Sequence, residues 1–302
     1  MENRVGLGDT TTRDILCCPI SEAELTMPAE GFLQSEDGLR LFLRRWEASA
    51  PRAACILVHG LAEHSGRYEI LAQNLTQRGF SVWAMDLRGH GKSGGGRTDC
   101  RSLDDYISDL KQLIFKIQSE VPALPRFLIG HSLGGLITLA YAAAYPESLR
   151  GVAVSSPALK LELELPKFKI MLTKTLDRLL PTTPIPNGID PALLSRDPEV
   201  VLAYKKDPLV ERRLSARCAV ALRNAVAGSF SYASRIKIPC LILQAGSDRI
   251  CDPEGASEFA RCAPADLISL RRYDGFYHEL FNEPEKKQVV DDLVRWLENL
   301  LN

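Results

Sequence analysis

The stretch from Arg126 to Tyr145 constrains the fold most, because it joins a strand to a helix through a serine turn. Residues 126–129 have the length and composition of a buried strand, and residues 133–145 are rich in Leu and Ala until Pro146 ends the helix. Between them stands Gly130-His131-Ser132-Leu133-Gly134. The glycines allow strand and helix to pass closely without Cβ clashes, while the turn strains the serine backbone. The sequence therefore predicts a nucleophile elbow, with a hydroxyl at a helix N-terminus that favours an oxyanion.

Strand-like and helix-like segments alternate from residue 53 onward, which is typical of a mostly parallel sheet with helices on both faces. Residues 31–34 and 39–46, joined by a turn sequence, predict an antiparallel hairpin at one edge. Ser102 is a suitable N-cap for a helix over residues 102–121. We expect further strands at 55–58, 81–85, 127–129, 152–155, 240–244 and 267–271, and further helices at 68–78, 133–145, 253–262 and 284–301.

The alternation stops between residues 157 and 235, where Pro-rich, basic and helical stretches replace it. We expect an inserted helical cap (lid) over residues 157–235, between two parts of one α/β catalytic domain, 29–156 and 236–302. The cap would follow the strand after the serine helix, so it would cover the C-terminal strand ends, where open α/β sheets bind ligands. Residues 1–28 are predicted to form a loosely docked polar tail.

The composition argues against several functional classes. A formal net charge of -1 gives no sign of a nucleic-acid partner, and the N-terminus has no apolar run like a signal peptide. No stretch approaches the roughly 18 apolar residues of a membrane span. We expect a cytoplasmic protein, with peripheral membrane contact left open. Eight cysteines without C-x-x-C spacing favour reduced thiols over disulfides or zinc ligands.

A serine hydroxyl becomes a nucleophile when a histidine, oriented by a carboxylate, takes its proton. On this fold the three residues follow the order Ser, Asp or Glu, His. His278 is the one histidine after Ser132, and it lies between the last strand and the last helix, so it is the predicted base. Among the fifteen acidic residues between them we favour Asp248, which directly follows a buried strand. Asp252 on the same loop is the second choice, and Asp190 would fit only an unusual arrangement.

An oxyanion hole needs two convergent backbone donors. The N–H of Leu133 follows the serine, and the N–H of Leu61 lies in the loop after an early strand, so these are the predicted donors. His59 and His64, with Glu63, are residue types that bind metals, but the H-E-x-x-H spacing is absent and no further ligand is evident. We expect the two histidines to hold the oxyanion loop in place through hydrogen bonds.

The segment from Arg88 to Gly94 contains G-x-G-x-x-G and Gly-Lys-Ser. A phosphate-binding P-loop would need Gly where Asp86 stands, and this segment does not open directly into a helix. We interpret it as a tight structural loop, and we expect neither a metal nor a cofactor.

Four segments resemble the monoacylglycerol lipase and lysophospholipase branch of the α/β-hydrolase family: His59 to Tyr68, Asp86 to Ser93, Gly130 to Gly135 and Tyr273 to Glu279. Ser195-Arg196, Asp207-Pro208-Leu209, Asn224-Ala225-Val226 and Asp248 to Asp252 are also similar to monoacylglycerol lipase. The resemblance spans roughly residues 30 to 300. It implies a triad of Ser132, Asp248 and His278, with Leu61 and Leu133 as oxyanion donors. Leu61 stands where the animal lipases usually have a smaller residue.

The resemblance implies a serine hydrolase that cleaves a monoacylglycerol, a lipid-like ester, to glycerol and a fatty acid through an acyl-enzyme. A lysophospholipase and a broad carboxylesterase are alternatives within the class. An aminopeptidase would need a cap carboxylate, such as Glu199 or Glu211, to hold the substrate ammonium group. A ligand-binding protein that keeps the fold without turnover is the alternative from another class.

Residues 167–180 predict an amphipathic cap helix whose other positions are mostly Lys and Arg. Its apolar face consists of Phe168, Met171, Leu172, Leu176, Leu179 and Leu180. Two roles remain open for it: packing on the catalytic domain, or contact with a lipid interface as a lid. Cys251, three residues after Asp248, is expected near the triad, and both a reactive and an inert thiol remain open.

Overall fold

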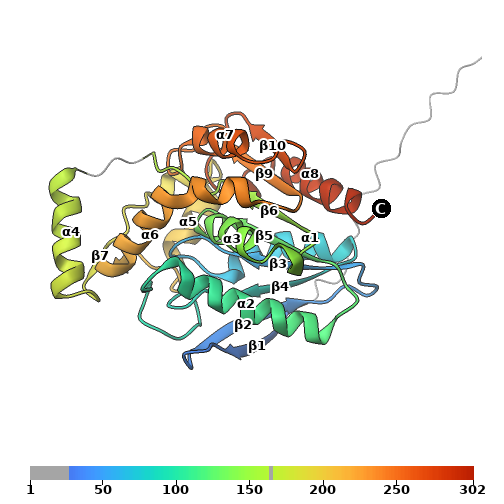
Figure 1. The fold of residues 1–302 in the computed structure, drawn as a ribbon, viewed down its shortest axis with the longest axis horizontal. Helices are drawn as coiled ribbons and strands as arrows, with labels where there is room; N and C mark the ends of the chain where they lie inside the picture. The colour runs from blue at the N-terminus through green and yellow to red at the C-terminus, as the bar shows by residue number, and fades with distance from the viewer. Residues whose placement is uncertain (1–26, 163–165) are drawn as a thin grey trace, which may run out of the picture.

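The computed structural model describes residues 27–162 and 166–302, so nearly all of the expected tail lies outside the described residues. An eight-stranded sheet forms the centre of the molecule (Figure 1). Its strand order is β1-β2-β4-β3-β5-β6-β9-β10. The bounds are β1 Ala29–Gln34, β2 Arg40–Trp46, β3 Ala53–Val58, β4 Phe80–Met85, β5 Arg126–His131, β6 Gly151–Ser155, β9 Cys240–Ala245 and β10 Ile268–Tyr273.

The sheet is parallel except at one edge. Strand β2 pairs antiparallel with both β1 and β4, whereas all later neighbours pair parallel. Every residue of β3, β4, β6 and β9 is buried, as expected for strands covered on both faces. The predicted α/β class, the mostly parallel sheet and the hairpin edge are therefore confirmed.

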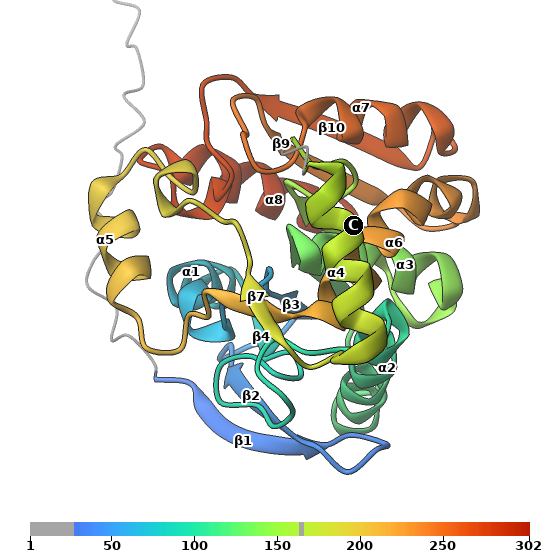
Figure 2. The same ribbon diagram turned by 90° about the vertical axis from the view of Figure 1, so that its left-hand side faces the viewer.

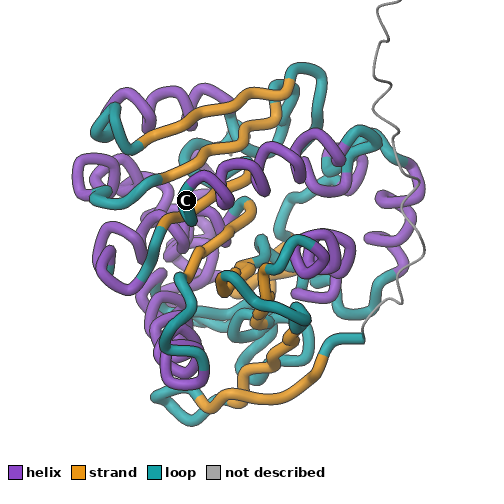
Figure 3. Tube along the Cα trace, turned by 90° about the vertical axis from the view of Figure 1, so that its right-hand side faces the viewer, coloured by secondary structure: helices purple, strands orange, loops and turns teal. Residues whose placement is uncertain are grey.

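Helices cover both faces of the sheet (Figure 3). Helices α1 (Glu69–Gln77) and α8 (Lys286–Asn299) pack on one face, within one hydrophobic cluster. Helices α2 (Leu103–Glu120), α3 (Leu133–Ala144) and α7 (Pro253–Cys262) pack on the other, within a second cluster. Ser102 caps α2 as predicted, because its hydroxyl accepts a hydrogen bond from the Asp104 N–H. Short 3-10 turns are η1 Ser65–Tyr68, η2 Pro146–Ser148 and η5 Leu280–Asn282.

The chain leaves the sheet after β6 and returns at β9. We call residues 156–239 the β6–β9 segment; it contains α4 Lys167–Leu179, β7 Pro184–Pro186, η3 Pro191–Leu193, α5 Pro198–Lys206, β8 Arg213–Ser215, α6 Ala216–Gly228 and η4 Ser229–Arg235. Strands β7 and β8 form a small antiparallel pair of their own. Helix α4 lies along α6 at the outer end of the molecule (Figures 1 and 2). The cap over residues 157–235 stays a prediction, and the β6–β9 segment contains those residues.

Two further expectations concern membranes and thiols. Within residues 27–162 and 166–302, no helix is long and apolar enough to cross a membrane. The six cysteines of these ranges are free thiols, and the sulfurs of Cys100 and Cys218 lie 3.4 Å apart. Cys17 and Cys18 lie outside the described residues.

Candidate active site

The three residues predicted as a triad lie at one edge of the sheet. Ser132 directly follows β5, Asp248 lies in the loop after β9, and His278 lies in the loop after β10. These strands are parallel, so their C-terminal ends meet at the same edge, where open α/β sheets bind ligands. Ser132 and His278 line one small cavity there.

The serine turn has the geometry that its glycines predict. Ser132 adopts φ 53° and ψ −115°, a backbone conformation that costs a residue other than glycine about 1–3 kcal/mol. A Cβ on Gly130 would lie 2.2 Å from the carbonyl oxygen of Gly134, and a Cβ on Gly134 would lie 2.1 Å from that of Val58. The Ser132 N–H donates to the Ser155 carbonyl at 2.9 Å, which helps to hold the strained turn. Strand and helix therefore pass closely only because both positions are glycine.

Asp248 and His278 form a buried pair. Nδ1 of His278 lies 2.7 Å from Oδ2 of Asp248, and the other carboxylate oxygen accepts the N–H groups of Ile250 and Cys251. The carboxylate is thus fixed from both sides. A proton on Nδ1 leaves the lone pair of the neutral imidazole on Nε2, the tautomer that a general base requires.

The surroundings of the pair favour the charged form of both groups, so the pKa of His278 rises and that of Asp248 falls. Burial disfavours an imidazolium, but the charge and hydrogen bond of Asp248, together with the charges of Glu279 and Glu63, outweigh burial and raise the pKa of His278 above its ordinary value. Burial of Asp248 opposes its ionisation, but His278 and two backbone N–H groups lower its pKa. His131, whose ring centroid is 4.7 Å from that of His278, is buried, and its pKa falls to about 4. His131 is therefore neutral at pH 7.

The other predicted acids are engaged elsewhere. Asp252 caps α7 by accepting the Glu254 N–H, and it forms an ion pair with Lys160 at 2.7 Å. Asp190 caps η3. Neither carboxylate contacts His278, so the geometry selects Asp248, the first choice from the sequence, as its partner.

The two predicted oxyanion donors lie beside Ser132. In the part of the chain that the structure describes, neither the Leu61 N–H nor the Leu133 N–H donates to another protein atom. Both residues line the larger of the two cavities at Ser132. His59 donates through Nδ1 to the Gly60 carbonyl and accepts the Leu87 N–H on Nε2, so it holds the oxyanion loop as expected.

His64 has the second predicted supporting role. Its Nδ1 accepts the Gly66 N–H, and its Nε2 lies 2.8 Å from Oδ2 of Asp207 in the β6–β9 segment. It thereby connects the oxyanion loop to the segment that covers the strand ends, rather than joining His59 in a metal site.

A buried ion cluster lies behind the two loops. Arg67 donates through both terminal nitrogens to the Glu279 carboxylate at 2.6 and 2.7 Å, and also to Glu63 at 2.6 Å. Glu63 in turn accepts the Gly60 N–H at 2.6 Å. Sequence reasoning weighed Glu63 only as a metal ligand and overlooked Arg67. The sequence carried a signal for one pair of the cluster alone, since an arginine lies four residues after Glu63.

A cavity of about 290 Å³ begins at Ser132 and extends under the β6–β9 segment. Its lining is mostly apolar and includes Leu61, Leu133, Ile170, Ile185, Leu222 and Ile250. A second cavity of about 30 Å³ on the His278 side shares Leu61, Ser132, Ile189 and Ile250 with the first, and is bordered by charged groups. Ser132 therefore stands between a large apolar cavity and a small one that charged side chains border. Glu199 and Glu211, proposed as ammonium-binding groups, line neither cavity.

Cys251 lies next to the pair, as expected. Its sulfur and the facing atoms of Asp248 and His278 are within 4.8 Å of one another. A metal there would have to displace the Asp248–His278 hydrogen bond and the two N–H groups on Asp248. Burial, followed by the Asp248 charge, raises the pKa of the Cys251 thiol well above its usual range. These observations favour the inert thiol of the two alternatives.

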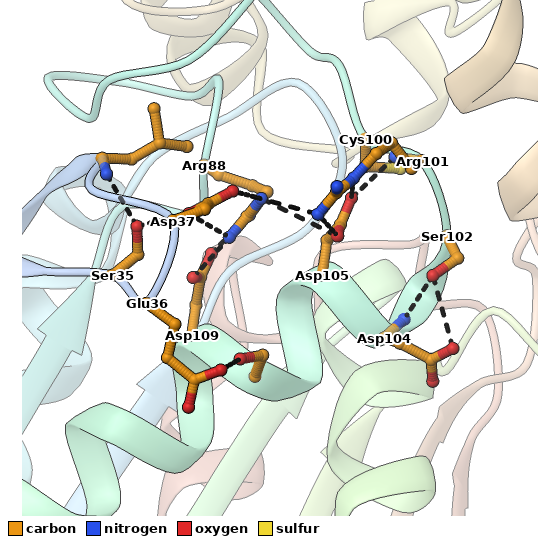
Figure 4. A network of polar contacts seen from close by, with 12 residues as sticks. Ser35, Glu36, Asp37, Arg88, Cys100, Arg101, Ser102, Asp104, Asp105 and Asp109 are labelled. Carbon is orange, nitrogen blue, oxygen red and sulfur yellow. Dashed lines mark hydrogen bonds and ion pairs between the residues drawn. The ribbon is translucent and has the colours of Figure 1, made fainter.

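The glycine-rich loop after β4 is structural, as interpreted from the sequence. Asp86, where a P-loop has glycine, accepts the N–H groups of Ser65 and Lys92. Arg88 makes two hydrogen bonds of 2.7 Å to Asp109 on α2 and further bonds to Asp37 in the hairpin turn (Figure 4). Arg88 therefore ties the hairpin turn to α2.

Three comparisons place the chain among known proteins. A family model described as serine aminopeptidase, S33, matches residues 49–285. The chain is 37% identical to a monoacylglycerol lipase of Mycolicibacterium smegmatis over 262 residues, 86% of this chain and 93% of the relative. It is 35% identical to a monoglyceride lipase of Rattus norvegicus over 270 residues, 88% and 89% of the two chains. The crystal structure of Paleococcus ferrophilus monoacylglycerol lipase has a TM-score of 0.79 and 36% identity, covering 86% of this chain and 99% of that one.

Proposed function

The chain belongs to the α/β-hydrolase family whose model is described as serine aminopeptidase, S33, and from this membership and its lipase relatives we propose a reaction. The protein is a serine hydrolase that cleaves monoacylglycerols to glycerol and a fatty acid. The resemblance to the monoacylglycerol lipase branch drawn from the sequence motifs is correct. One observation supports the activity most: Ser132 stands on a strained elbow at the end of a mostly apolar cavity, beside the buried Asp248–His278 pair.

The proposed reaction uses the chain's own groups. His278 accepts the Ser132 proton on Nε2 while Ser132 Oγ attacks the ester carbonyl carbon. The Leu61 and Leu133 N–H groups stabilise the oxyanion that forms. His278 then protonates the leaving glycerol oxygen, which leaves an acyl-enzyme. A water molecule, deprotonated by His278, releases the fatty acid by the same two steps in reverse.

The two cavities fit the acyl chain of such an ester and the water that attacks the acyl-enzyme. The large apolar cavity would take the acyl chain, since burying methylene groups is favourable by about 0.8 kcal/mol each. The smaller cavity of about 30 Å³ is large enough for the attacking water. An aminopeptidase would instead need a free carboxylate beside Ser132. The Asp190 carboxylate borders the large cavity but caps η3.

One observation favours a second candidate, a lysophospholipase. Lys174, Arg223 and Arg249 border the large cavity, and none of the three forms an ion pair within residues 27–162 and 166–302. Three cations around an apolar cavity would suit a lipid ester that carries a phosphate.

We also propose that the protein acts from the cytoplasm by peripheral contact with a lipid surface through α4. Its apolar side chains Phe168, Met171, Leu172 and Leu179 are exposed, and no residue of α4 is buried. Lys167, Lys169, Lys174 and Arg178 supply basic groups along the same helix. Basic amphipathic helices lie in lipid interfaces in this way.

The test is turnover of the purified full chain on a panel of monoacylglycerols, lysophospholipids, short p-nitrophenyl esters and amino-acid amides. We expect kcat/KM to be highest for a monoacylglycerol, and Ser132→Ala to lose at least about two powers of ten of the rate while staying folded. A higher kcat/KM for a lysophospholipid would select the second candidate, and preference for an amide would overturn both. Labelling by a fluorophosphonate probe separates any of these enzymes from a binding protein without turnover.

A further inference from the structure

Arg67, Glu63 and Glu279 form a compact ion cluster whose side chains are nearly buried, with exposed fractions of 10%, 5% and 4%. The aromatic ring of Tyr204 on α5 covers it, with the guanidinium carbon 4.8 Å from the ring centroid. The cluster is thus shielded from solvent. Ion pairs in such a buried position are stronger and more directional than ion pairs at a surface. Such a cluster needs an explanation, because burying three charges is costly.

The cluster joins two loops that come from distant parts of the chain. On one side, Glu63 accepts the N–H of Gly60, the residue before the proposed oxyanion donor Leu61. On the other side, Glu279 directly follows His278 and is held by Arg67 in a two-pronged contact. A continuous path of hydrogen bonds therefore runs from the oxyanion loop to the loop that carries the proposed base.

Other contacts fix the outer ends of this path. Asn282 donates to the Glu279 carboxylate at 2.9 Å, and the Glu279 N–H donates to the Leu194 carbonyl at 2.8 Å. Tyr68 donates its hydroxyl to Glu63 at 2.7 Å. Both carboxylates are therefore held from several directions, and Arg67 is the group that links them.

We propose that Arg67 is a positioning residue that keeps the His278 loop in register with the oxyanion loop, an inference that rests on the proposed serine hydrolase function. The base and the oxyanion donors act on the same tetrahedral intermediate, so an error in their separation affects the transition state directly. A misplacement of about 1 Å can cost about 10²-fold in rate. Arg67 itself takes no proton and forms no bond to the reacting atoms.

The critical variant is Arg67→Lys, which keeps the positive charge and removes the two-pronged contact. We expect kcat on a p-nitrophenyl ester to fall about 10- to 100-fold, with KM within about twofold of the wild-type value. The rate of fluorophosphonate labelling should fall in parallel, because it depends on the same base and oxyanion groups but not on the natural substrate. If the wild type is labelled but ignores monoacylglycerols, the substrate assignment fails and the Arg67 test still stands.

A matched control is Arg88→Lys. Arg88 is another nearly buried arginine in a two-pronged contact, with Asp109, but it ties the hairpin to α2 and contacts neither loop of the site. A purely structural role predicts similar losses of Tm and similar activities for the two variants. Positioning predicts that only Arg67→Lys loses kcat.

The pH profile separates positioning from an effect of charge. The groups facing His278 are Asp248 and Cys251 from the β9–α7 loop, His131 from β5, Glu63 and Arg67 from the β3–α1 loop, and Glu279 beside it. Arg67→Lys leaves their charges unchanged, so the acid limb of kcat/KM should keep its midpoint while the plateau falls. Glu279→Gln removes a negative charge that favours the imidazolium, so its acid limb should move to lower pH and its plateau should also fall.

Several results would overturn the proposal. One is an Arg67→Lys enzyme with kcat within about threefold of wild type, and another is a raised KM at unchanged kcat, which would mean that Arg67 contacts substrate. A shifted acid limb with an unchanged plateau would mean a charge effect alone. If Arg67→Lys does not fold, Glu279→Gln decides by its plateau: a plateau equal to wild type rejects positioning, and a lowered plateau at unchanged KM supports it.

Discussion

Oδ2 of Asp248 lies 2.7 Å from Nδ1 of His278, across the ends of two adjacent parallel strands. The two residues are 30 positions apart in sequence, and the register of β9 with β10 brings their loops together. Because the second oxygen of Asp248 is held by two backbone N–H groups, the carboxylate can orient the imidazole without moving itself. The pair is therefore preorganised before any substrate binds.

Replacing Asp248 with Asn should lower kcat by about three to four powers of ten, because an amide favours the wrong tautomer of His278. Asp252→Asn is the matched control on the same loop. Asn caps a helix as well as Asp, so this variant keeps the α7 cap and loses only the charge of the Lys160 pair; it should cost little stability and leave kcat nearly unchanged. Steady-state kinetics with thermal unfolding of both variants checks this, and an Asp248→Asn enzyme of normal speed would move the acid elsewhere.

The acid side of the pH profile should report His278. Only the neutral imidazole can accept the Ser132 proton, so activity is present above the pKa of His278 and is lost as the pH falls through it. Asp248 raises that pKa above its ordinary value, so the midpoint of the acid limb of kcat/KM should lie above about 6.5. A midpoint well below 6.5, or a flat profile from pH 5 to 8, would contradict the assignment of His278 as base.

Gly134→Ala should be strongly destabilising. Its Cβ would lie 2.1 Å from the Val58 carbonyl oxygen, a backbone atom that cannot move without separating α3 from β3. Overpacking of this kind costs about 1–3 kcal/mol or more. Gly228→Ala is the control, since a Cβ there has no atom within 4 Å and the position ends a helix. Thermal unfolding should show a large loss of Tm for Gly134→Ala and little change for Gly228→Ala.

Local patterns predicted the central fold and the proposed catalytic residues because both depend on short-range rules. A strand, a serine between two glycines and a helix determine the elbow, and the parallel sheet brings the ends of β5, β9 and β10 to one edge. His278 could be selected by its position in the chain, since no other histidine follows Ser132. Their roles in catalysis stay a prediction.

Other features could not be predicted, since they depend on contacts between distant residues. Arg67 and Glu279 are 212 positions apart, so no local pattern reports their ion pair. Similarly, the amphipathic pattern of α4 shows that an apolar face exists but not what covers it. The structure shows that packing on the catalytic domain, one of the two roles considered, is wrong for Phe168, Met171, Leu172 and Leu179, which are all exposed.

The exposed face of α4 leads to the last prediction. Met171 and Leu179 are 68% and 73% exposed, so replacing both with Ser should leave the core and Tm nearly unchanged. If α4 contacts a lipid surface, the double variant should bind anionic vesicles more weakly and hydrolyse long-chain monoacylglycerol in vesicles more slowly. Its rate on a soluble short ester should stay near normal, because neither residue lines the cavity at Ser132.

Phe115→Ser provides the matched control for this experiment. Phe115 is 73% exposed on α2 and lines neither cavity at Ser132, so its replacement removes one large exposed apolar side chain from another helix. Vesicle binding that falls only in the α4 variant would tie the effect to α4 rather than to general surface hydrophobicity. Equal vesicle binding by the wild type and both variants would exclude membrane contact through α4. So would an α4 variant that loses activity on vesicle and soluble substrates alike, together with Tm, since an interfacial helix affects turnover only where an interface is present.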